Sequence, residues 1–361
     1  MRAFDYSSAT TLSDVASSLD GQARPLAGGT DLLPLMKLDV AAPPRLVDIK
    51  RVADLRPDVQ PDGDGVRIGA LTTLAALESH PVLRERYTAL AESAGLAASP
   101  QLRNMATLGG NLLQRPRCWY FRSSLFHCWL KGGTECHARD GENQYHAILG
   151  DSPCVAVHPS DPPAALLLFD AVVHTTRREI ALADFFAEPS EDRRTENVLA
   201  PDELIVAITL PPARGRSTYL KAMNRKVWAF ALVGVAVRLD FAPSPASASA
   251  QGASPAEQSP SPAEQPSSPS GARGPASSAA QSPASLTVAD ARVVLNGVAT
   301  IPYRASAAEA ALVGKPLTES SIAAAADAAI ASAHPLAHNG YKLPLTQGLL
   351  RQALRSLSAS S

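Results

Sequence analysis

The chain has 361 residues, 45% of them hydrophobic, so it can bury one or two substantial cores, and its length suggests two domains of ordinary size. Its 33 Lys and Arg residues nearly balance its 34 Asp and Glu residues, so no net field draws it to nucleic acid or to an anionic membrane. No apolar run approaches the roughly 20 residues that span a bilayer, and the N-terminus lacks the apolar core of a signal peptide. We therefore expect a soluble protein with no export signal of its own and with the cytoplasm as its default location.

The first hundred residues predict strands and helices in alternation. Strands are expected at residues 1–6, 24–27, 46–49 and 66–70, and helices from Leu12 onward and across residues 74–96 with a break at Pro81. This alternation favours α/β organisation over an all-β sandwich.

The pattern is lost from Gln101 to about Asp161, and a loop of that length in a compact domain either has a function or is disordered. Further strands are expected at residues 166–175, 205–210 and 291–298, a hairpin at 219–225 and 230–239, and helices at 305–312 and 322–333. We therefore expect a first domain of residues 1–213 and a smaller α+β domain of residues 214–355.

Residues 243–285 interrupt this second domain with a change of composition. They contain no apolar residue larger than Ala or Pro, so nothing in them repays the entropy of ordering. We expect a disordered insert between two strands. A proline-rich segment that docks a partner is the alternative.

Two glycine turns predict a ligand site in the first domain. Paired glycines let a backbone approach a ligand closely, and a following helix start points N–H groups at it, which suits a pyrophosphate. The spacing matches neither the Walker A nor the Rossmann motif, and a plain tight turn is the structural alternative. Two such turns can clamp a dinucleotide from opposite sides. Their residues are Leu26, Ala27, Gly28, Gly29, Thr30, Asp31 and Leu32 in the first and Thr107, Gly109, Gly110 and Asn111 in the second.

All four cysteines, Cys118, Cys128, Cys136 and Cys154, fall within one loop, residues 114–158, called the cysteine loop below. Four thiolates from one loop fit an iron–sulfur cluster or zinc, and the absence of a C-x-x-C pair weakens zinc. Five aromatic residues beside the first two cysteines supply an apolar shell that supports a redox site. Local packing with disulfides or free thiols is the alternative. Four nearby histidines are left out of the metal shell.

Taken together, several motifs resemble one family. They are Ala27–Leu32, Gln101–Asn104, Thr107–Leu112 and Pro159–Asp161, and they resemble the FAD-binding subunits of xanthine dehydrogenases and molybdenum aldehyde oxidoreductases. The cysteine loop is similar to that of the branch whose flavin subunit holds an extra 4Fe-4S cluster, and the pattern of heterotrimeric bacterial aldehyde oxidoreductases is closer than that of 4-hydroxybenzoyl-CoA reductases.

The resemblance implies a fold, a cofactor and site residues. The fold is α+β: a two-part FAD-binding domain of the vanillyl-alcohol oxidase-like type, then a smaller α+β domain like that of carbon monoxide dehydrogenase flavoproteins. The two glycine turns hold the FAD pyrophosphate, Asp161 makes a polar contact to the cofactor, and Lys221 lies near the isoalloxazine edge. The four cysteines hold the 4Fe-4S cluster. Without the resemblance, Lys221 would be interpreted as a solvated lysine on the surface of a strand.

The resemblance also implies partners. Hydroxylation occurs at a molybdenum centre in a large subunit, a small subunit carries 2Fe-2S clusters, and this chain passes electrons through FAD to an external acceptor. A folded complex can also reach the periplasm on a partner's signal. The alternatives are a 4-hydroxybenzoyl-CoA reductase-like subunit, a stand-alone FAD oxidase, and a noncatalytic module held together by zinc. No acid–base or nucleophilic centre is evident in the chain itself.

Overall fold

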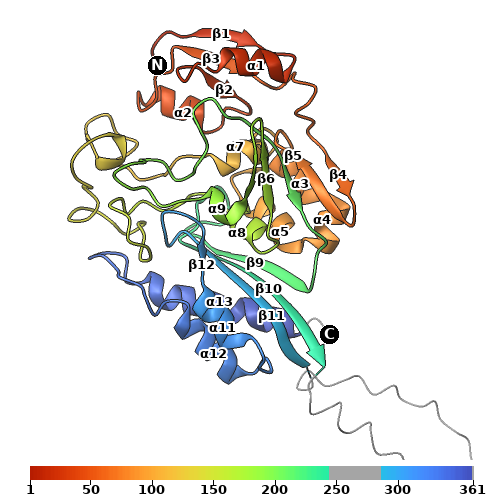
Figure 1. Cartoon of the computed structure of the whole chain (residues 1–361). Coiled ribbons are helices and arrows are strands. Elements are labelled where there is room, and N and C mark those ends of the chain that lie inside the picture. Colours follow the sequence, from red (N-terminus) through yellow and green to blue (C-terminus); the bar gives the residue numbers. More distant parts are fainter. Residues whose placement is uncertain (244–285, 360–361) are drawn as a thin grey trace, which may run out of the picture.

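The computed structural model describes residues 1–243 and 286–359 (Figure 1). Apart from its first residue, the expected disordered insert 243–285 lies outside this range. The described chain forms three sheets, each covered by helices, and this mixture confirms the expected α+β class. Within the described residues, no helix is both long enough and apolar enough to cross a bilayer.

The first sheet has three parallel strands in the order β1-β3-β2. The strands are β1 (Asp5–Ser8), β2 (Arg24–Leu26) and β3 (Arg45–Asp48), and the helices α1 (Leu12–Ser18) and α2 (Leu32–Lys37) connect them. Parallel neighbours need such crossover connections. The first glycine turn is the link from β2 to α2, as the sequence predicts.

The second sheet has five antiparallel strands in the order β4-β5-β8-β6-β7. The strands are β4 (Val59–Asp62), β5 (Gly65–Gly69), β6 (Val172–Thr175), β7 (Glu179–Ala181) and β8 (Ile205–Leu210). The helices that accompany it are α3 (Leu74–Ser79), α4 (Pro81–Arg86), α5 (Thr88–Leu96), α6 (Pro100–Arg103), α7 (Leu108–Leu112), α8 (Pro162–Leu167) and α9 (Leu182–Phe185). The expected break at Pro81 is present, because this proline begins α4.

The strand expected at residues 166–175 is wrong in its first half. Pro162 and Pro163 begin helix α8, which continues to Leu167, and β6 starts only at Val172. Proline is favoured in a first helical turn, where its missing N–H has no partner to lose. Asp170 then adopts a positive φ of 51°, which turns the chain between helix and strand.

The third sheet is antiparallel, in the order β12-β11-β10-β9. Its strands are β9 (Arg216–Ala222), β10 (Val233–Pro243), β11 (Leu286–Asn296) and β12 (Tyr303–Arg304), and the helices α11 (Ser306–Leu312), α12 (Glu319–Ala328) and α13 (Lys342–Ala359) follow. Strands β9 and β10 form the expected hairpin with shifted ends. Helices α11 and α13 pack on this sheet (Figure 1). The sequence predicted no helix at α13.

The third sheet also packs against the middle of the molecule. Helix α5 contacts β9, and α8 contacts β10 and β11. As a result Tyr219, Ala236 and Val294 of this sheet belong to the same apolar core as the five-stranded sheet. The cysteine loop, yellow in Figure 1, lies to one side of this core and contains only one short helix, the 3-10 turn η1 (Trp129–Lys131). The expected irregularity is confirmed for this loop, but it is wrong for the start of the segment expected from Gln101, where α6 and α7 are helical.

Candidate functional site: a cavity between two glycine turns and a buried cysteine loop

One large cavity collects every residue predicted to contact FAD. Its volume is about 820 Å³, within the range of roughly 300–1,000 Å³ that is usual for cofactor sites. Both glycine turns line it, as do Asp161 and Lys221, and the loop after β9 adds Trp228 and Phe230. The structure therefore brings together residues that lie almost 200 positions apart in the sequence.

The first turn needs its two glycines for different reasons. A Cβ atom at Gly28 would lie 1.8 Å from the carbonyl oxygen of Met105, so no larger residue fits. Gly29 has a φ of 70°, in the left-handed region that L side chains rarely adopt. Because Met105 lies two residues before Thr107, the close approach at Gly28 also joins the two turns.

The second turn is held by one local hydrogen bond and by two bonds to residues distant in the sequence. The Thr107 hydroxyl accepts a bond of 3.3 Å from the N–H of Gly110 and so caps α7. The N–H of Gly109 donates to the carbonyl of Ala70 at 2.9 Å. Asn111 is buried, and its side-chain oxygen accepts from the Ser160 hydroxyl. This last bond fixes the turn to the segment that carries Asp161.

The carboxylate of Asp31 faces the cysteine loop rather than its own helix. It makes no capping bond to α2. Instead it accepts from the Arg115 N–H at 2.8 Å and from the guanidinium groups of Arg117 and Arg122 at 2.7 Å each. The first glycine turn and the cysteine loop are thus joined by a charged cluster. The Asp31 side chain is therefore occupied, and its backbone carbonyl accepts from the N–H of Leu35 at 3.2 Å.

Asp161 is the centre of a second buried network. Its carboxylate accepts from the Tyr219 hydroxyl at 2.6 Å, from the Lys221 ammonium at 2.7 Å and from the Asn296 amide at 3.1 Å. These donors belong to β9 and β11, whereas Asp161 precedes α8, so the network joins the two parts of the chain.

Burial defines the electrostatics of this network. The Lys221 side chain is only 1% exposed, which excludes surface solvation as its role. Burial, together with the negative charge of Asp161, raises the pKa of Tyr219 well above its usual value. The phenol therefore stays protonated and keeps donating to Asp161, while Lys221 supplies the compensating positive charge at the edge of the cavity.

The four cysteines lie close together in an apolar setting. All four are free thiols, so the disulfide alternative is wrong, and all four belong to one cluster with Leu35, Phe121 and Trp129. Cys128 and Cys154 are buried, and Cys118 and Cys136 are partly buried. The aromatic shell expected beside the first two cysteines is present. Trp119 packs edge-on against Tyr145 and His146, which come from the far end of the loop.

Hydrogen-bond donors point at the cysteine sulfurs. The N–H groups of Tyr120 and Phe121 face Cys118, and the N–H of Ala156 lies 3.4 Å from the Cys154 sulfur. Burial raises the pKa of Cys118 to about 11, whereas hydrogen bonding by the Cys154 thiol lowers the pKa of Cys136 to about 6. Backbone N–H groups that donate to a sulfur favour its thiolate form.

Among the described residues, no three His, Cys, Asp or Glu side chains come close enough together to hold a single metal ion. A cluster of several irons is larger than one ion and needs sulfurs that stand farther apart around it. What the structure shows is four free thiols in one apolar cluster with backbone donors facing two of the sulfurs. His146 lies 3.2 Å from the Cys118 sulfur through Nε2, which orients this thiol.

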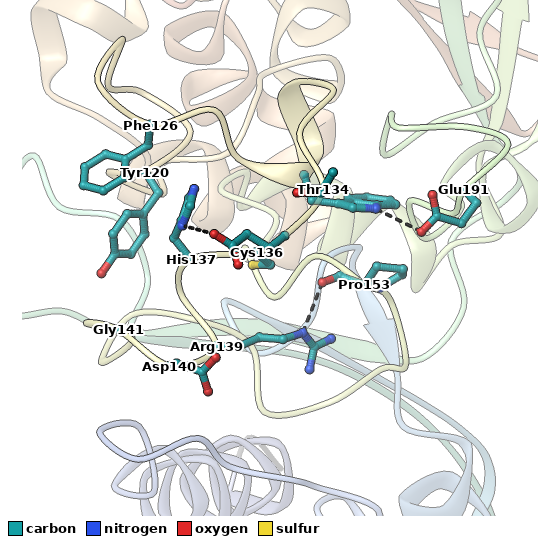
Figure 2. Close-up of a pocket in the computed structure, with 12 residues that line it drawn as sticks. Tyr120, Phe126, Thr134, Cys136, His137, Arg139, Asp140, Gly141, Pro153 and Glu191 are labelled. Carbon is teal, nitrogen blue, oxygen red and sulfur yellow. Dashed lines mark hydrogen bonds and ion pairs between the residues drawn. The ribbon is translucent and has the colours of Figure 1, made fainter.

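A second pocket opens beside the cysteines. Its volume is about 620 Å³, and Figure 2 shows Cys136 near its centre, with Tyr120, Phe126 and His137 on one side and Glu191 on the other. Tyr120 and Phe126 pack edge to face with their centroids 5.0 Å apart. The pocket is the exposed side of the cysteine loop.

Several residues of these sites were not predicted as such. Arg117 and Phe230 line the large cavity and stack on each other, with the guanidinium carbon 4.7 Å from the ring centroid. Arg117 precedes Cys118 directly. The pair Arg115 and Arg117 beside a cysteine is the sequence feature that could have pointed to a charged site here. Phe230 gave no signal, because an aromatic residue at the start of a strand is usual in a core.

Two family models match the chain. One describes the FAD binding domain in molybdopterin dehydrogenase and matches residues 2–213. The other describes the C-terminal domain of carbon monoxide dehydrogenase flavoproteins and matches residues 276–357. Together they confirm the expected fold, a flavin-binding domain followed by a smaller α+β domain.

Curated relatives and solved structures agree with these models. The aldehyde oxidoreductase FAD-binding subunit PaoB of Escherichia coli (strain K12) is 36% identical over 100% of both chains. The carbon monoxide dehydrogenase medium chain of Hydrogenophaga pseudoflava is 26% identical, over 98% of this chain and 96% of that one. A solved carbon monoxide dehydrogenase from the same organism, lacking the Mo-pyranopterin moiety of its cofactor, matches with a TM-score of 0.68 and 26% identity over 99% and 98% of the two chains.

Proposed function

Since this chain belongs to the family of FAD-binding subunits of molybdenum hydroxylases such as xanthine dehydrogenases and aldehyde oxidoreductases, we propose that it passes electrons from partner subunits through FAD to an external acceptor. The observation that carries this proposal is the single cavity that both glycine turns, Asp161 and Lys221 line. A noncatalytic module with purely structural turns does not account for such a cavity.

The residues of the cavity have separate tasks in this proposal. The backbones of Gly28 to Asp31 and of Thr107 to Asn111 hold the pyrophosphate, where a side chain on Gly28 would displace Met105. Lys221, held by Asp161, places a positive charge beside the isoalloxazine ring. Bound FAD supplies the exchange between one-electron and two-electron transfer. The protein orients the ring, excludes water and leaves one edge accessible to the acceptor.

We assign the four cysteines to a 4Fe-4S cluster. Their free thiols, their apolar surroundings and the backbone donors aimed at sulfur support this assignment. The charged bridge from Asp31 to Arg117 and Arg122 holds the cluster loop against the flavin turn. In this arrangement the chain fixes two redox groups at a constant separation.

The names of the relatives support a place in a multi-subunit enzyme. The E. coli relative is a subunit of an aldehyde oxidoreductase, and the Hydrogenophaga relative is named a medium chain. We therefore propose a large molybdenum-cofactor subunit and a small 2Fe-2S subunit as partners, an aldehyde as the substrate of the complex, and the cytoplasm as its location. A 4-hydroxybenzoyl-CoA reductase-like complex is the second candidate. A stand-alone oxidase is disfavoured, because these full-length relatives are named as subunits or chains of larger enzymes.

Removal of the flavin tests the proposed route. In Gly28→Ala the new methyl group meets the Met105 carbonyl, so the purified complex is expected to lose FAD. Gly348→Ala is the matched control, because Gly348 lies in α13 with nothing within 4 Å of a new Cβ. With aldehyde added anaerobically, the flavin-free complex should still reduce its partner clusters and fail to reduce the acceptor. Acceptor reduction at the control rate without flavin would overturn the proposal.

A further inference from the structure

Lys342, at the start of α13, is a buried cation with no carboxylate partner. Its side chain is fully buried. The ammonium donates to the carbonyl oxygens of Tyr145 at 3.1 Å, His146 at 2.9 Å and Gly297 at 2.6 Å. No ion pair involving Lys342 occurs among the residues that the structure describes. A buried ammonium surrounded only by carbonyl groups costs free energy unless a negative charge lies near it.

Two of the three carbonyls that Lys342 binds, those of Tyr145 and His146, belong to the cysteine loop. His146 presents its backbone oxygen to the ammonium and its ring to the sulfur of Cys118, 3.2 Å from Nε2. One residue therefore separates the buried cation from a predicted cluster ligand. Lys342 follows Cys118 by more than 200 positions, so the C-terminal domain delivers this charge to a site made by the first domain.

The same turn of the C-terminal domain holds the loop by neutral bonds as well. The buried Asn339 amide donates to the carbonyls of His146 at 3.2 Å and Ala147 at 3.0 Å. The backbone N–H of His338 donates to the Asn143 side chain at 2.9 Å, and the Tyr341 hydroxyl donates to the Gln144 carbonyl at 2.8 Å. Anchoring of the loop thus has other contributors, which carry no charge.

No titratable group that faces Lys342 supplies the missing negative charge. His146 faces Lys342 with its backbone carbonyl and turns its ring towards the Cys118 sulfur, so it brings no carboxylate to the ammonium. Burial raises the pKa of Tyr341, so that phenol is neutral. Burial lowers the pKa of Lys342 to about 7, so without an anion nearby its charge would be partly lost. The four thiols gathered beyond His146 are the candidate anion, because thiolates that hold iron keep a net negative charge.

We propose that Lys342 is a positioning residue of the cysteine centre, whose buried ammonium holds the 145–146 backbone behind Cys118 and balances the negative charge of the thiolate-bound cluster. This inference rests on the cluster assigned under the proposed function. A fixed cation near a cluster favours its more negative, reduced form, so Lys342 raises the reduction potential. The effect is electrostatic and separate from the anchoring that Asn339 shares.

Two substitutions of the full chain separate charge from anchoring. Lys342→Met keeps the length of the side chain without its charge, and Lys342→Arg keeps the charge. Asn339→Ala removes two hydrogen bonds to the loop and leaves the charge unchanged. The readout is the midpoint potential of the iron–sulfur signal in an anaerobic redox titration followed by electron paramagnetic resonance. The flavin potential in the same sample is the internal reference.

Lys342→Met should decrease the reduced-to-oxidised ratio of the cluster about tenfold at a fixed potential, a shift of about 59 mV to more negative values for a one-electron couple. The flavin potential should move less, and Lys342→Arg and Asn339→Ala should keep the wild-type cluster potential. An unchanged cluster potential in Lys342→Met would overturn the proposed role of Lys342 and leave the cluster assignment standing. If Lys342→Met does not fold, Asn339→Ala decides. A shift of about 59 mV to more negative values in Asn339→Ala, with a wild-type potential in Lys342→Arg, would overturn the proposal, since anchoring would then set the potential. Wild-type protein without iron after reconstitution would overturn the cluster and this inference together.

Discussion

Replacing Asp161 by Asn isolates the energy of the buried network that joins the two parts of the chain. The change keeps the volume of the side chain and one acceptor oxygen, so the bond from Tyr219 at 2.6 Å can persist. The Lys221 ammonium, whose side chain is 1% exposed, loses its only carboxylate among the ion pairs of the described residues. Breaking a buried pair by removing one partner costs about 3–5 kcal/mol, and we expect the lower end because a polar atom remains.

Urea denaturation of the FAD-free chain measures this loss. With a slope of about 3 kcal/mol per molar urea, a loss of about 3 kcal/mol lowers the midpoint by about 1 M. Asp202→Asn is the control: Asp202 pairs with Arg177, both side chains are at least 40% exposed, and such pairs contribute about 0–1 kcal/mol. Adding Lys221→Met to Asp161→Asn should restore most of the midpoint, since no charge then stays unpaired. Equal midpoint shifts in Asp161→Asn and Asp202→Asn would refute the reasoning.

Two further predictions follow from charged pairs elsewhere. Arg117→Met leaves the Asp31 carboxylate less neutralised beside the FAD phosphates and should weaken FAD binding about tenfold, or about 1.4 kcal/mol. Equilibrium dialysis would measure this, with Arg139→Met, outside the cavity, expected to bind normally. Burial of the Glu203 carboxyl opposes its ionisation. Its hydrogen bonds, the one from Arg178 above all, outweigh this effect and lower its pKa from 4.5 to about 2. Because the pKa is lowered in the folded state, this stabilisation is complete above about pH 5 and is lost as the pH falls towards about 2. Glu203→Gln should therefore flatten the loss of stability between pH 5 and pH 3, and an unchanged pH profile would contradict this.

The parts of the site that depend on local backbone were accessible from the sequence. Paired glycines permit a left-handed backbone and a close backbone contact, so the ligand turn at Gly28 and Gly29 could be anticipated from neighbouring residues alone. The irregular cysteine loop could be anticipated in the same way, because its segment has no apolar period.

The parts that depend on distant partners were not accessible. Asp31 read as a ligand for phosphate, and its carboxylate proved to be taken by Arg117 and Arg122, about 90 residues away. Lys221 could be placed near the flavin only through the family resemblance, and nothing in the sequence singled out Lys342. Both are buried by contacts that only the folded chain creates. The strand expected from residue 166 failed because Pro162 begins a helix whose apolar residues are buried all round, a pattern without period.

The central claim is that one chain holds both a flavin and an iron–sulfur cluster. An anaerobic ultraviolet–visible spectrum of the purified chain, with iron and acid-labile sulfide assays beside a Cys118→Ser variant, tests it most directly. The account predicts flavin bands together with a broad reducible iron–sulfur shoulder, about four irons per chain, and loss of these irons with retention of flavin in the variant. Flavin without iron in the reconstituted wild type would contradict the assignment of the four cysteines, and neither chromophore would contradict the flavin site as well.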